Sequence, residues 1–333
     1  MENKYIIVAD IGGTNARFGL CHIDSGEIST IENFQTADYP GIEEVIEVYL
    51  GRCQSHGCIT STKAIKAGCF AIATAITSDQ IKMTNNAWQF SRTKVQSQFD
   101  FDHLFFINDF TAVSMAIPML KENDVIQFGG QNAIKDQPVG VYGAGTGLGV
   151  SYLIPAQGKW VTFAAEGGHV DFAPTCNEEI AILKYTRNFY QGRVSAERIL
   201  SGMGIVNIYN ALCEHHNQTA QFTEAKDITA HALDNSCTIS VKTLEHFCRI
   251  LGRFGGNLAL TLGAFGGIYL AGGIVPKILP FFEKSDFRAG FEDKGRFSEY
   301  TRNIPVFLIT HPQTGLLGSG AFARQELGIQ LHH

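Results

Sequence analysis

Five polar side chains of this 333-residue chain could bind the hydroxyl groups of a small uncharged ligand. They are Asn108, Asp109, Glu166, His169 and Glu197. The set offers many hydrogen-bond acceptors and few cations, whereas a site for a phosphorylated substrate would need Arg or Lys. Acceptors of this kind also reject analogues that lack a hydroxyl, because the buried acceptors would be left unpaired. The set therefore favours a neutral polyol.

Asp109 is the best placed of these residues to act as a base. It follows Asn108 and the apolar run 104–107, and the carboxyl end of a strand points into the crevice where α/β sheets bind ligands. There it could accept a proton from a substrate hydroxyl. Asp109 could equally cap the helix that follows, although Thr111 could cap that helix alone and leave Asp109 for the ligand.

The other carboxylates also have two interpretations. Two glycines separate Glu166 from His169, so both side chains could reach one ligand from a tight loop, or both could lie in a solvated surface loop. Ser195 is expected to cap a helix. Glu197 would then lie in the first turn of that helix, where the helix dipole stabilises an acidic side chain. The functional interpretation makes Glu197 a third carboxylate directed at the ligand.

Two glycine-rich turns could bind phosphate groups. Residues 8–15 read VADIGGTN and residues 141–149 read VYGAGTGLG, each with an apolar run before the turn. Glycine permits positive φ and close approach of a ligand, and successive exposed N–H groups form an anion-binding concavity. Either turn alone could be an ordinary hairpin. Together with the five polar residues, the pair favours a nucleotide held at its phosphates.

The spacing of these glycines excludes two common nucleotide motifs. A dinucleotide fingerprint needs G-x-G-x-x-G, but the sixth position is Leu148 when counted from Gly143 and Val150 when counted from Gly145. A P-loop needs Gly-Lys followed by Ser or Thr, but the Gly-Lys pair at 158–159 precedes a tryptophan.

Composition limits the remaining possibilities. The length suggests about two domains, and 45% apolar with 17% charged residues indicates a globular chain. A net charge of −6 without a Lys/Arg cluster argues against nucleic acid or an anionic membrane as partner. The eight cysteines form no C-x-x-C, and no secretory signal precedes the first strand, so we expect reduced thiols and a cytoplasmic location.

One uncharged segment, 254–276, is long enough to span a bilayer. Its many glycines divide it better into the end of a buried helix, a strand at 268–271 and a turn at Gly272-Gly273. We therefore expect no membrane span.

The elements that must position the polar residues follow from the apolar pattern. Predicted strands lie at 5–9, 16–22, 28–34, 65–72 and 104–107, and then at 124–128, 139–143, 148–154, 160–164, 268–271 and 305–309. Predicted helices lie at 41–53, at 111–120, over much of 178–264 and at 314–328. Strands followed by helices, twice over, predict an α/β chain with an internal duplication.

Eight segments resemble the bacterial glucokinase family of the hexokinase–actin-like superfamily. They are ADIGGTNARFGL (9–20), MTNNAW (83–88), INDFTAVSMAIPML (107–120), YGAGTGLGV (142–150), EGGHVDFAP (166–174), SAERILSG (195–202), GRFGGNLAL (252–260) and LAGGIVPK (270–277). The resemblance implies two actin-like (ribonuclease H-like) α/β domains flanking a deep cleft. The small domain would be 1–110 plus 315–333, and the large domain 111–314.

The same resemblance implies ATP-dependent phosphorylation of D-glucose to glucose 6-phosphate, with Asp109 as general base of an in-line transfer. Glucose would be bound by Asn108, Asp109, Glu166, His169 and Glu197. The nucleotide would be bound by Ala9, Asp10, Ile11, Gly12, Gly13 and Thr14, by Gly145 and Thr146, and by Gly272 and Gly273 of an adenosine motif. Mg²⁺ is the implied cofactor, with Asp10 near it through water. A homodimer is also implied.

Two departures from related families bear on these expectations. Ala75 stands where the family segment has proline. Only Cys176 follows the E-G-G-H segment, whereas the related ROK sugar kinases have a zinc-binding cysteine cluster there, so we expect no structural zinc. The first strand begins too early for the helix-turn-helix of ROK repressors.

Two alternatives remain open at this point. The chain could be a kinase for another hexose, such as fructose or mannose, or a catalytically silent sugar-binding regulator. Asp109 and both glycine-rich turns are intact, which argues against a silent protein.

Overall fold

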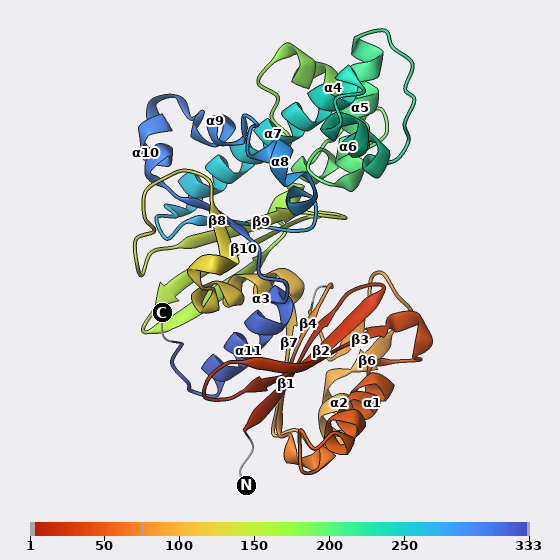
Figure 1. The fold of residues 1–333 in the computed structure, drawn as a ribbon, viewed down its shortest axis with the longest axis vertical. Coiled ribbons are helices and arrows are strands. Elements are labelled where there is room, and N and C mark those ends of the chain that lie inside the picture. Colours follow the sequence, from red (N-terminus) through yellow and green to blue (C-terminus); the bar gives the residue numbers. More distant parts are fainter. Residues whose placement is uncertain (1–3, 75, 332–333) are drawn as a thin grey trace. The chain divides into compact units, whose positions relative to one another are not determined.

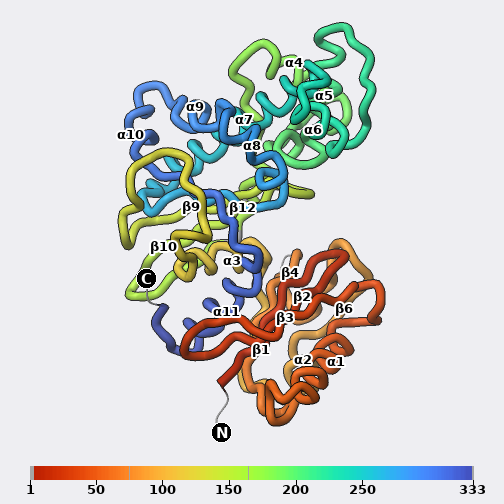
Figure 2. The backbone as a smooth tube through the Cα atoms, in the orientation of Figure 1, coloured from red at the N-terminus to blue at the C-terminus, as the bar shows by residue number. Residues whose placement is uncertain are grey.

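The computed structural model describes residues 4–74 and 76–331, so Ala75 lies outside the described residues (Figures 1 and 2). The chain divides into two compact units. Unit 1 comprises residues 1–122, 155–164 and 311–333, and unit 2 comprises 123–154 and 165–310. Both units contain a sheet and helices, as the α/β prediction required.

Unit 1 is built on a five-stranded sheet in the order β3-β2-β1-β4-β7. The strands are β1 (Tyr5–Ile11), β2 (Asn15–His22), β3 (Ile28–Gln35), β4 (Ala67–Ile72) and β7 (His103–Asn108). β1 pairs antiparallel with β2 and parallel with β4, which pairs parallel with β7. The carboxyl ends of β1, β4 and β7 therefore lie at one edge of the sheet.

Helices cover both faces of this sheet, because β1 is apolar on both sides. Ile7 and Ala9 pack in one core with α1 (Ile42–Ser55) and α2 (Arg92–Gln98). Ile6 and Val8 pack in a second core with α3 (Asp109–Ala116) and α11 (Thr314–Glu326). Figure 1 shows the two helix pairs on opposite sides of the sheet.

The packing of α3 on α11 explains where unit 1 ends. Our expected boundary at residue 110 falls inside α3, but this helix belongs to unit 1 as a whole. In α11, a Cβ at Gly318 would overlap the carbonyl oxygen of Ala112 in α3, so the two helices approach closely only because this position is glycine.

Unit 2 contains a six-stranded sheet in the order β11-β10-β9-β12-β13-β8. The strands are β8 (Val125–Gln127), β9 (Val139–Ala144), β10 (Leu148–Ala156), β11 (Lys159–Ala165), β12 (Ile268–Ala271) and β13 (Val306–Ile309). β9 is antiparallel to β10 and parallel to β12. The contact-based division assigns the last two residues of β10 and most of β11 to unit 1.

The helices of unit 2 pack around the long helix α7. They are α4 (Asn177–Arg187), α5 (Gly202–His215), α6 (Ala225–Leu233), α7 (Thr238–Leu262), α8 (Leu279–Phe282), α9 (Phe287–Glu292) and α10 (Ser298–Asn303). Helix α7 ends at Gly263, which has the positive φ of a left-handed cap. The uncharged segment thus divides into helix and strand as expected, and no described helix is long and apolar enough to cross a membrane.

Several short elements complete the fold. Short 3-10 helices lie at Thr36–Asp38, Thr62–Ala64, Ile117–Met119, Glu122–Asp124, Gly167–His169, Ala196–Arg198, Val275–Ile278 and Gly295–Phe297. A small hairpin of β5 (Gln80–Lys82) and β6 (Gln89–Ser91) precedes α2. Neither the hairpin nor α2 was expected from the sequence. Three-residue strands leave almost no alternation to detect, and α2 buries Val95 alone, which leaves no helical apolar pattern.

Replacing Gly318 by alanine should destabilise unit 1, because the added methyl group meets the backbone of α3. Overpacking of this kind typically costs about 1–3 kcal/mol. Gly51 in α1 is the matched control, since a Cβ there meets no atom within 4 Å and alanine is the better helix former. Thermal unfolding should show a lower midpoint for Gly318→Ala and an equal or higher one for Gly51→Ala. Equal midpoints for both variants would contradict the close packing.

Candidate active site

The first glycine-rich turn joins β1 to β2 in unit 1 and has a tightly fixed backbone. The N–H of Gly12 donates to the carbonyl of Asn15 at 2.9 Å, and the carbonyl of Gly13 accepts from the Thr36 hydroxyl at 2.7 Å. A Cβ at Gly13 would lie 2.6 Å from the Cβ of Asn85. The conformation therefore depends on glycine here, and Asn85 comes from the MTNNAW segment.

A cavity of about 320 Å³ opens at this turn. It is lined by Asp10, Gly12, Gly13, Thr14, Asn15 and Arg17. The expected phosphate-binding residues of this turn thus border a cavity whose lining also includes Arg17. Sequence reasoning missed Arg17, because it lies within β2 and not in the glycine motif.

Asp10 and Asp109 interact electrostatically in unit 1, although about a hundred residues separate them in the sequence. β1 carries Asp10 and β7 leads to Asp109, and β4 lies between these two strands. Burial and the Asp109 carboxylate raise the pKa of Asp10 to about 6, while Arg17 acts in the opposite direction. Asp10 also lies against Gly315 of α11, where a Cβ would come 2.5 Å from the carboxyl group.

Asn108 caps helix α3, so the expected cap at Asp109 or Thr111 was wrong. The Asn108 side-chain oxygen accepts from the N–H of Phe110 at 2.9 Å, and Asp109 is the first residue of the helix. One Asp109 oxygen also accepts from this N–H at 2.9 Å. Asp109 is half-buried at the carboxyl end of β7. Capping fixes the side-chain oxygen of Asn108 and leaves its amide NH₂ group as the donor for a ligand.

The second glycine-rich turn joins β9 to β10 in unit 2, beside the Gly272-Gly273 turn that follows β12. A Cβ at Gly143 would overlap the carbonyl of Ala271, and Gly272 has a φ of +85°. The N–H of Ile274 donates to the carbonyl of Ala144 at 3.3 Å. Both expected nucleotide segments of this unit therefore lie at the carboxyl ends of neighbouring parallel strands.

Glu197 reaches the second turn directly. One of its carboxylate oxygens accepts from the N–H of Leu148 at 3.0 Å, and a Cβ at Gly147 would lie 2.6 Å from the same oxygen. Glu197 lies in the 3-10 helix Ala196–Arg198. The hydrogen bond links the expected sugar-binding carboxylate to the expected phosphate turn.

Ser195 does not cap an α-helix as expected. It precedes only the 3-10 helix that contains Glu197 and makes no side-chain capping bond, and α5 begins after Ser201. Ser195 instead forms a β-bridge with Asp171. This bridge brings the Glu197 segment next to the loop that contains Glu166 and His169.

Glu166 and His169 lie in one tight loop, with 3.9 Å between the Glu166 Oε2 and the His169 Nε2. Both side chains are exposed. The glycines between them pack on β10, since a Cβ at Gly168 would overlap the carbonyl of Leu148. Arg193, which sequence reasoning missed, donates to the carbonyl of His169 at 2.6 Å and pairs with Asp171 at 2.9 Å.

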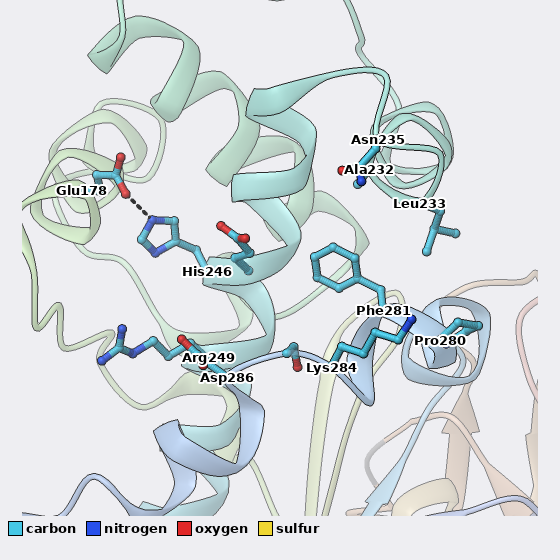
Figure 3. A pocket seen from close by; sticks show the side chains of 12 residues that line it. Glu178, Ala232, Leu233, Asn235, His246, Arg249, Pro280, Phe281, Lys284 and Asp286 are labelled. Carbon is cyan, nitrogen blue, oxygen red and sulfur yellow. Dashed lines mark hydrogen bonds and ion pairs between the residues drawn. The ribbon is translucent and has the colours of Figure 1, made fainter.

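The structure therefore groups the expected site residues into two sets. Unit 1 brings together the first turn, Asn108 and Asp109. Unit 2 brings together the second turn, the Gly272-Gly273 turn, the E-G-G-H loop and Glu197. A separate cavity of about 630 Å³ in unit 2, bordered by Glu178, His246 and Arg249 among others, is lined by none of these residues (Figure 3).

Comparison with known proteins identifies the family. The family model described as Glucokinase matches residues 7–326. Glucokinases of Shigella sonnei and Escherichia fergusonii are each 54% identical over 325 residues, which cover 98% of this chain and 98% of theirs. The chain belongs to the glucokinase family. The expected family and its activity, ATP-dependent phosphorylation of glucose, are thereby confirmed.

Solved glucokinase structures confirm the actin-like fold class. The crystal structure of a glucokinase from an Antarctic psychrotroph is 32% identical, covers 97% of this chain and 99% of its own, and superposes with a TM-score of 0.88. A ROK family glucokinase from Streptomyces griseus, in complex with glucose and AMPPNP, is 18% identical with a TM-score of 0.60 and shares the fold.

Replacing Asp10 by asparagine should stabilise the protein at neutral pH. A carboxyl whose pKa is raised by folding opposes folding once it ionises, so the wild type loses stability as pH rises from about 4 through about 6. Asp10→Asn avoids this loss of stability. The loss is at most about 3 kcal/mol, because folding raises the pKa of Asp10 from 3.8 to about 6. Chemical unfolding at pH 4 and pH 7 should show the advantage of the variant growing with pH. Asp102→Asn, at an exposed position, is the control. A pH-independent difference for Asp10→Asn would contradict the raised pKa of Asp10.

Proposed function

We propose that this chain transfers the γ-phosphoryl group of ATP to the 6-hydroxyl of D-glucose, with Asp109 as the general base. The observation that carries this assignment is the position of Asp109. It is half-buried at the carboxyl end of β7, in electrostatic contact with Asp10 at the end of β1. A base for the attacking hydroxyl and a carboxylate suited to a phosphate-bound cation thus lie at the carboxyl ends of two strands of one sheet, β7 and β1, with β4 between them.

In the proposed reaction, Asp109 accepts the proton of the sugar hydroxyl as its oxygen attacks the γ-phosphorus in line. The new oxygen–phosphorus bond forms while the bond from the γ-phosphorus to the bridging oxygen of ADP breaks. Phosphoryl transfer requires little covalent chemistry from the protein, so most of the acceleration comes from positioning and charge stabilisation.

The glycine-rich turns are proposed to bind the nucleotide. Backbone N–H groups and the hydroxyls of Thr14 and Thr146 would donate to the β- and γ-phosphates, and the small residues at Gly272 and Gly273 would admit the nucleoside. Mg²⁺ bound with ATP would neutralise phosphate charge. Asp10 fits this cation, because a positive charge beside it would offset the burial and the Asp109 repulsion that together raise its pKa.

The sugar is proposed to be held by Asn108, Asp109, Glu166, His169 and Glu197. Most of these groups would accept hydrogen bonds from the sugar hydroxyls, while the Asn108 amide would donate one.

Two further proposals concern the whole molecule. It is a homodimer, and it acts in the cytoplasm, in accord with its eight unpaired cysteines.

Replacing Asp109 by asparagine should lower kcat by about 10²–10⁴, the usual contribution of a positioned base. Glucose binding should remain measurable by calorimetry, because asparagine keeps the shape and most polar contacts. Asp102→Asn removes an exposed carboxylate from the same unit and should leave kcat unchanged. Near-normal turnover by Asp109→Asn would rule out Asp109 as the base.

Replacing Glu197 separates its two proposed roles. Glutamine keeps a side-chain oxygen for the Leu148 N–H, so Glu197→Gln should raise the KM for glucose more than the KM for ATP. Glu197→Ala leaves that N–H without its partner and should raise both KM values. Steady-state kinetics with each substrate varied in turn measures this difference. If neither variant changes the KM for glucose, Glu197 is not a sugar ligand.

A further inference from the structure

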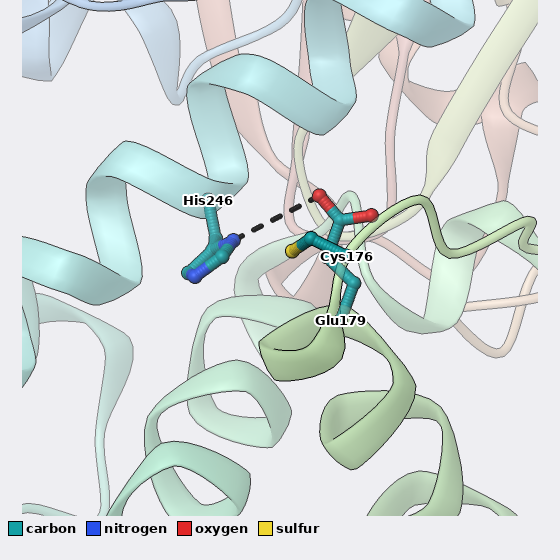
Figure 4. A group of neighbouring side chains, drawn as sticks. All are labelled: Cys176, Glu179 and His246. Atoms are coloured by element: carbon teal, nitrogen blue, oxygen red, sulfur yellow. Dashed lines mark ion pairs between the residues drawn. The ribbon is translucent and has the colours of Figure 1, made fainter.

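We propose that unit 2 contains a binding site for a transition-metal dication of the zinc type, formed by Cys176, Glu179 and His246. One ligand atom from each residue, a thiol sulfur, a carboxylate oxygen and an imidazole nitrogen, lies within 4.8 Å of the other two. Figure 4 shows the three side chains converging from the start of α4 and from α7. None of them belongs to the sugar or nucleotide sets, and the site does not depend on the proposed function.

Two of the ligands are held in the protein interior and the third lies at the surface. The Glu179 side chain is 1% exposed and that of His246 is 12% exposed, whereas Cys176 is exposed. Cys176 immediately precedes α4 and makes no capping hydrogen bond, so its side chain is not used by the helix. The interior pair forms a fixed base, and Cys176 can close over an ion that enters from solvent.

The histidine ring is oriented by a carboxylate behind it. His246 Nε2 lies 2.8 Å from Oε2 of Glu178, and the other oxygen of Glu178, Oε1, accepts from Lys242 at 2.7 Å. When Nε2 donates to Glu178, the lone pair of Nδ1 points away from Glu178, and Nδ1 lies 3.8 Å from Glu179 Oε1. A carboxylate that holds the outer nitrogen of a ligating histidine is the usual second contact of protein zinc sites.

Glu179 is fixed in a similar way. Its Oε2 accepts from the N–H of Thr175 and from Arg253, each at 2.7 Å, which leaves Oε1 on the side of His246. The N–O separation of 3.8 Å is too long for a hydrogen bond. Two ligands of a tetrahedral ion with bonds of about 2.0–2.1 Å lie roughly 3.3 Å apart, so a small inward movement suffices.

The ligand set selects the class of ion. Thiolate and imidazole favour Zn²⁺ and similar ions, whereas Mg²⁺ and Ca²⁺ prefer oxygen ligands. On binding, the Cys176 thiol loses its proton to solvent and its sulfur bonds to the metal. Three protein ligands leave a fourth position for water. Arg253 and Lys242 already pair with Glu179 and Glu178, so we expect an exchangeable ion, unlike a structural zinc in a cysteine cluster.

Cobalt absorption tests the site directly. Co²⁺ added to the purified, reduced protein should produce the near-ultraviolet charge-transfer band of a cobalt–thiolate bond, and Zn²⁺ should abolish the band by displacement. Cys176→Ser should lose the band. Cys58→Ser, at a partly exposed cysteine of unit 1, should keep it. Absence of the band in the wild type, or its persistence in Cys176→Ser, would overturn the proposal.

Calorimetry with Zn²⁺ gives a second and independent readout. Glu178→Gln should bind Zn²⁺ about 10–100-fold more weakly, as expected when the group that orients a ligating histidine is altered. His246→Gln should weaken binding further. Far-ultraviolet circular dichroism of each variant checks that it is folded. Equal Zn²⁺ affinity in the wild type and a folded His246→Gln would also overturn the site.

Discussion

Burial of the Asp10 carboxylate beside the like charge of Asp109 is the constraint on which the candidate site of unit 1 depends. The parallel pairing of β1, β4 and β7 brings the ends of these strands to one edge, and α11 packs against Asp10 through Gly315. Burial and like charge raise the pKa of Asp10 to about 6, which is unfavourable for the unliganded fold at neutral pH. A phosphate-bound cation beside Asp10, as proposed above, would relieve that cost.

In unit 2, steric contact between backbone segments constrains the candidate site. Its expected site segments lie so close together that backbone meets backbone. Gly143 lies against Ala271, and Gly168 lies against Leu148, with no room for a Cβ at either glycine. Glu197 then joins its own 3-10 helix to the second glycine-rich turn through one hydrogen bond from the Leu148 N–H. Small residues and one carboxylate thus fix the relative positions of these segments.

The elements and motifs were largely predictable from the sequence, because strands buried on both faces and repeated glycine turns leave strong local patterns. Features that depend on contacts between distant parts of the sequence could not be predicted in this way. Asn108, Asp109 and Thr111 can each cap a helix, and only the path of the chain after β7 selects Asn108. The Glu197–Leu148 bond spans 49 residues, and His246 reaches α4 from a helix far along the chain. Unit 1 extends past residue 110 because α3 packs on α11 from the other end of the sequence.

The most direct test of the central claim is to incubate the protein with Mg·ATP and, separately, glucose, mannose or fructose. ADP release is followed continuously, and NMR identifies the phosphorylated carbon of the product. We expect one ADP per sugar phosphorylated, the highest kcat/KM with glucose, and phosphate on the 6-oxygen of the product. Absence of ADP release with every sugar would indicate a silent binding protein, and a higher kcat/KM for mannose or fructose would contradict glucose as the substrate.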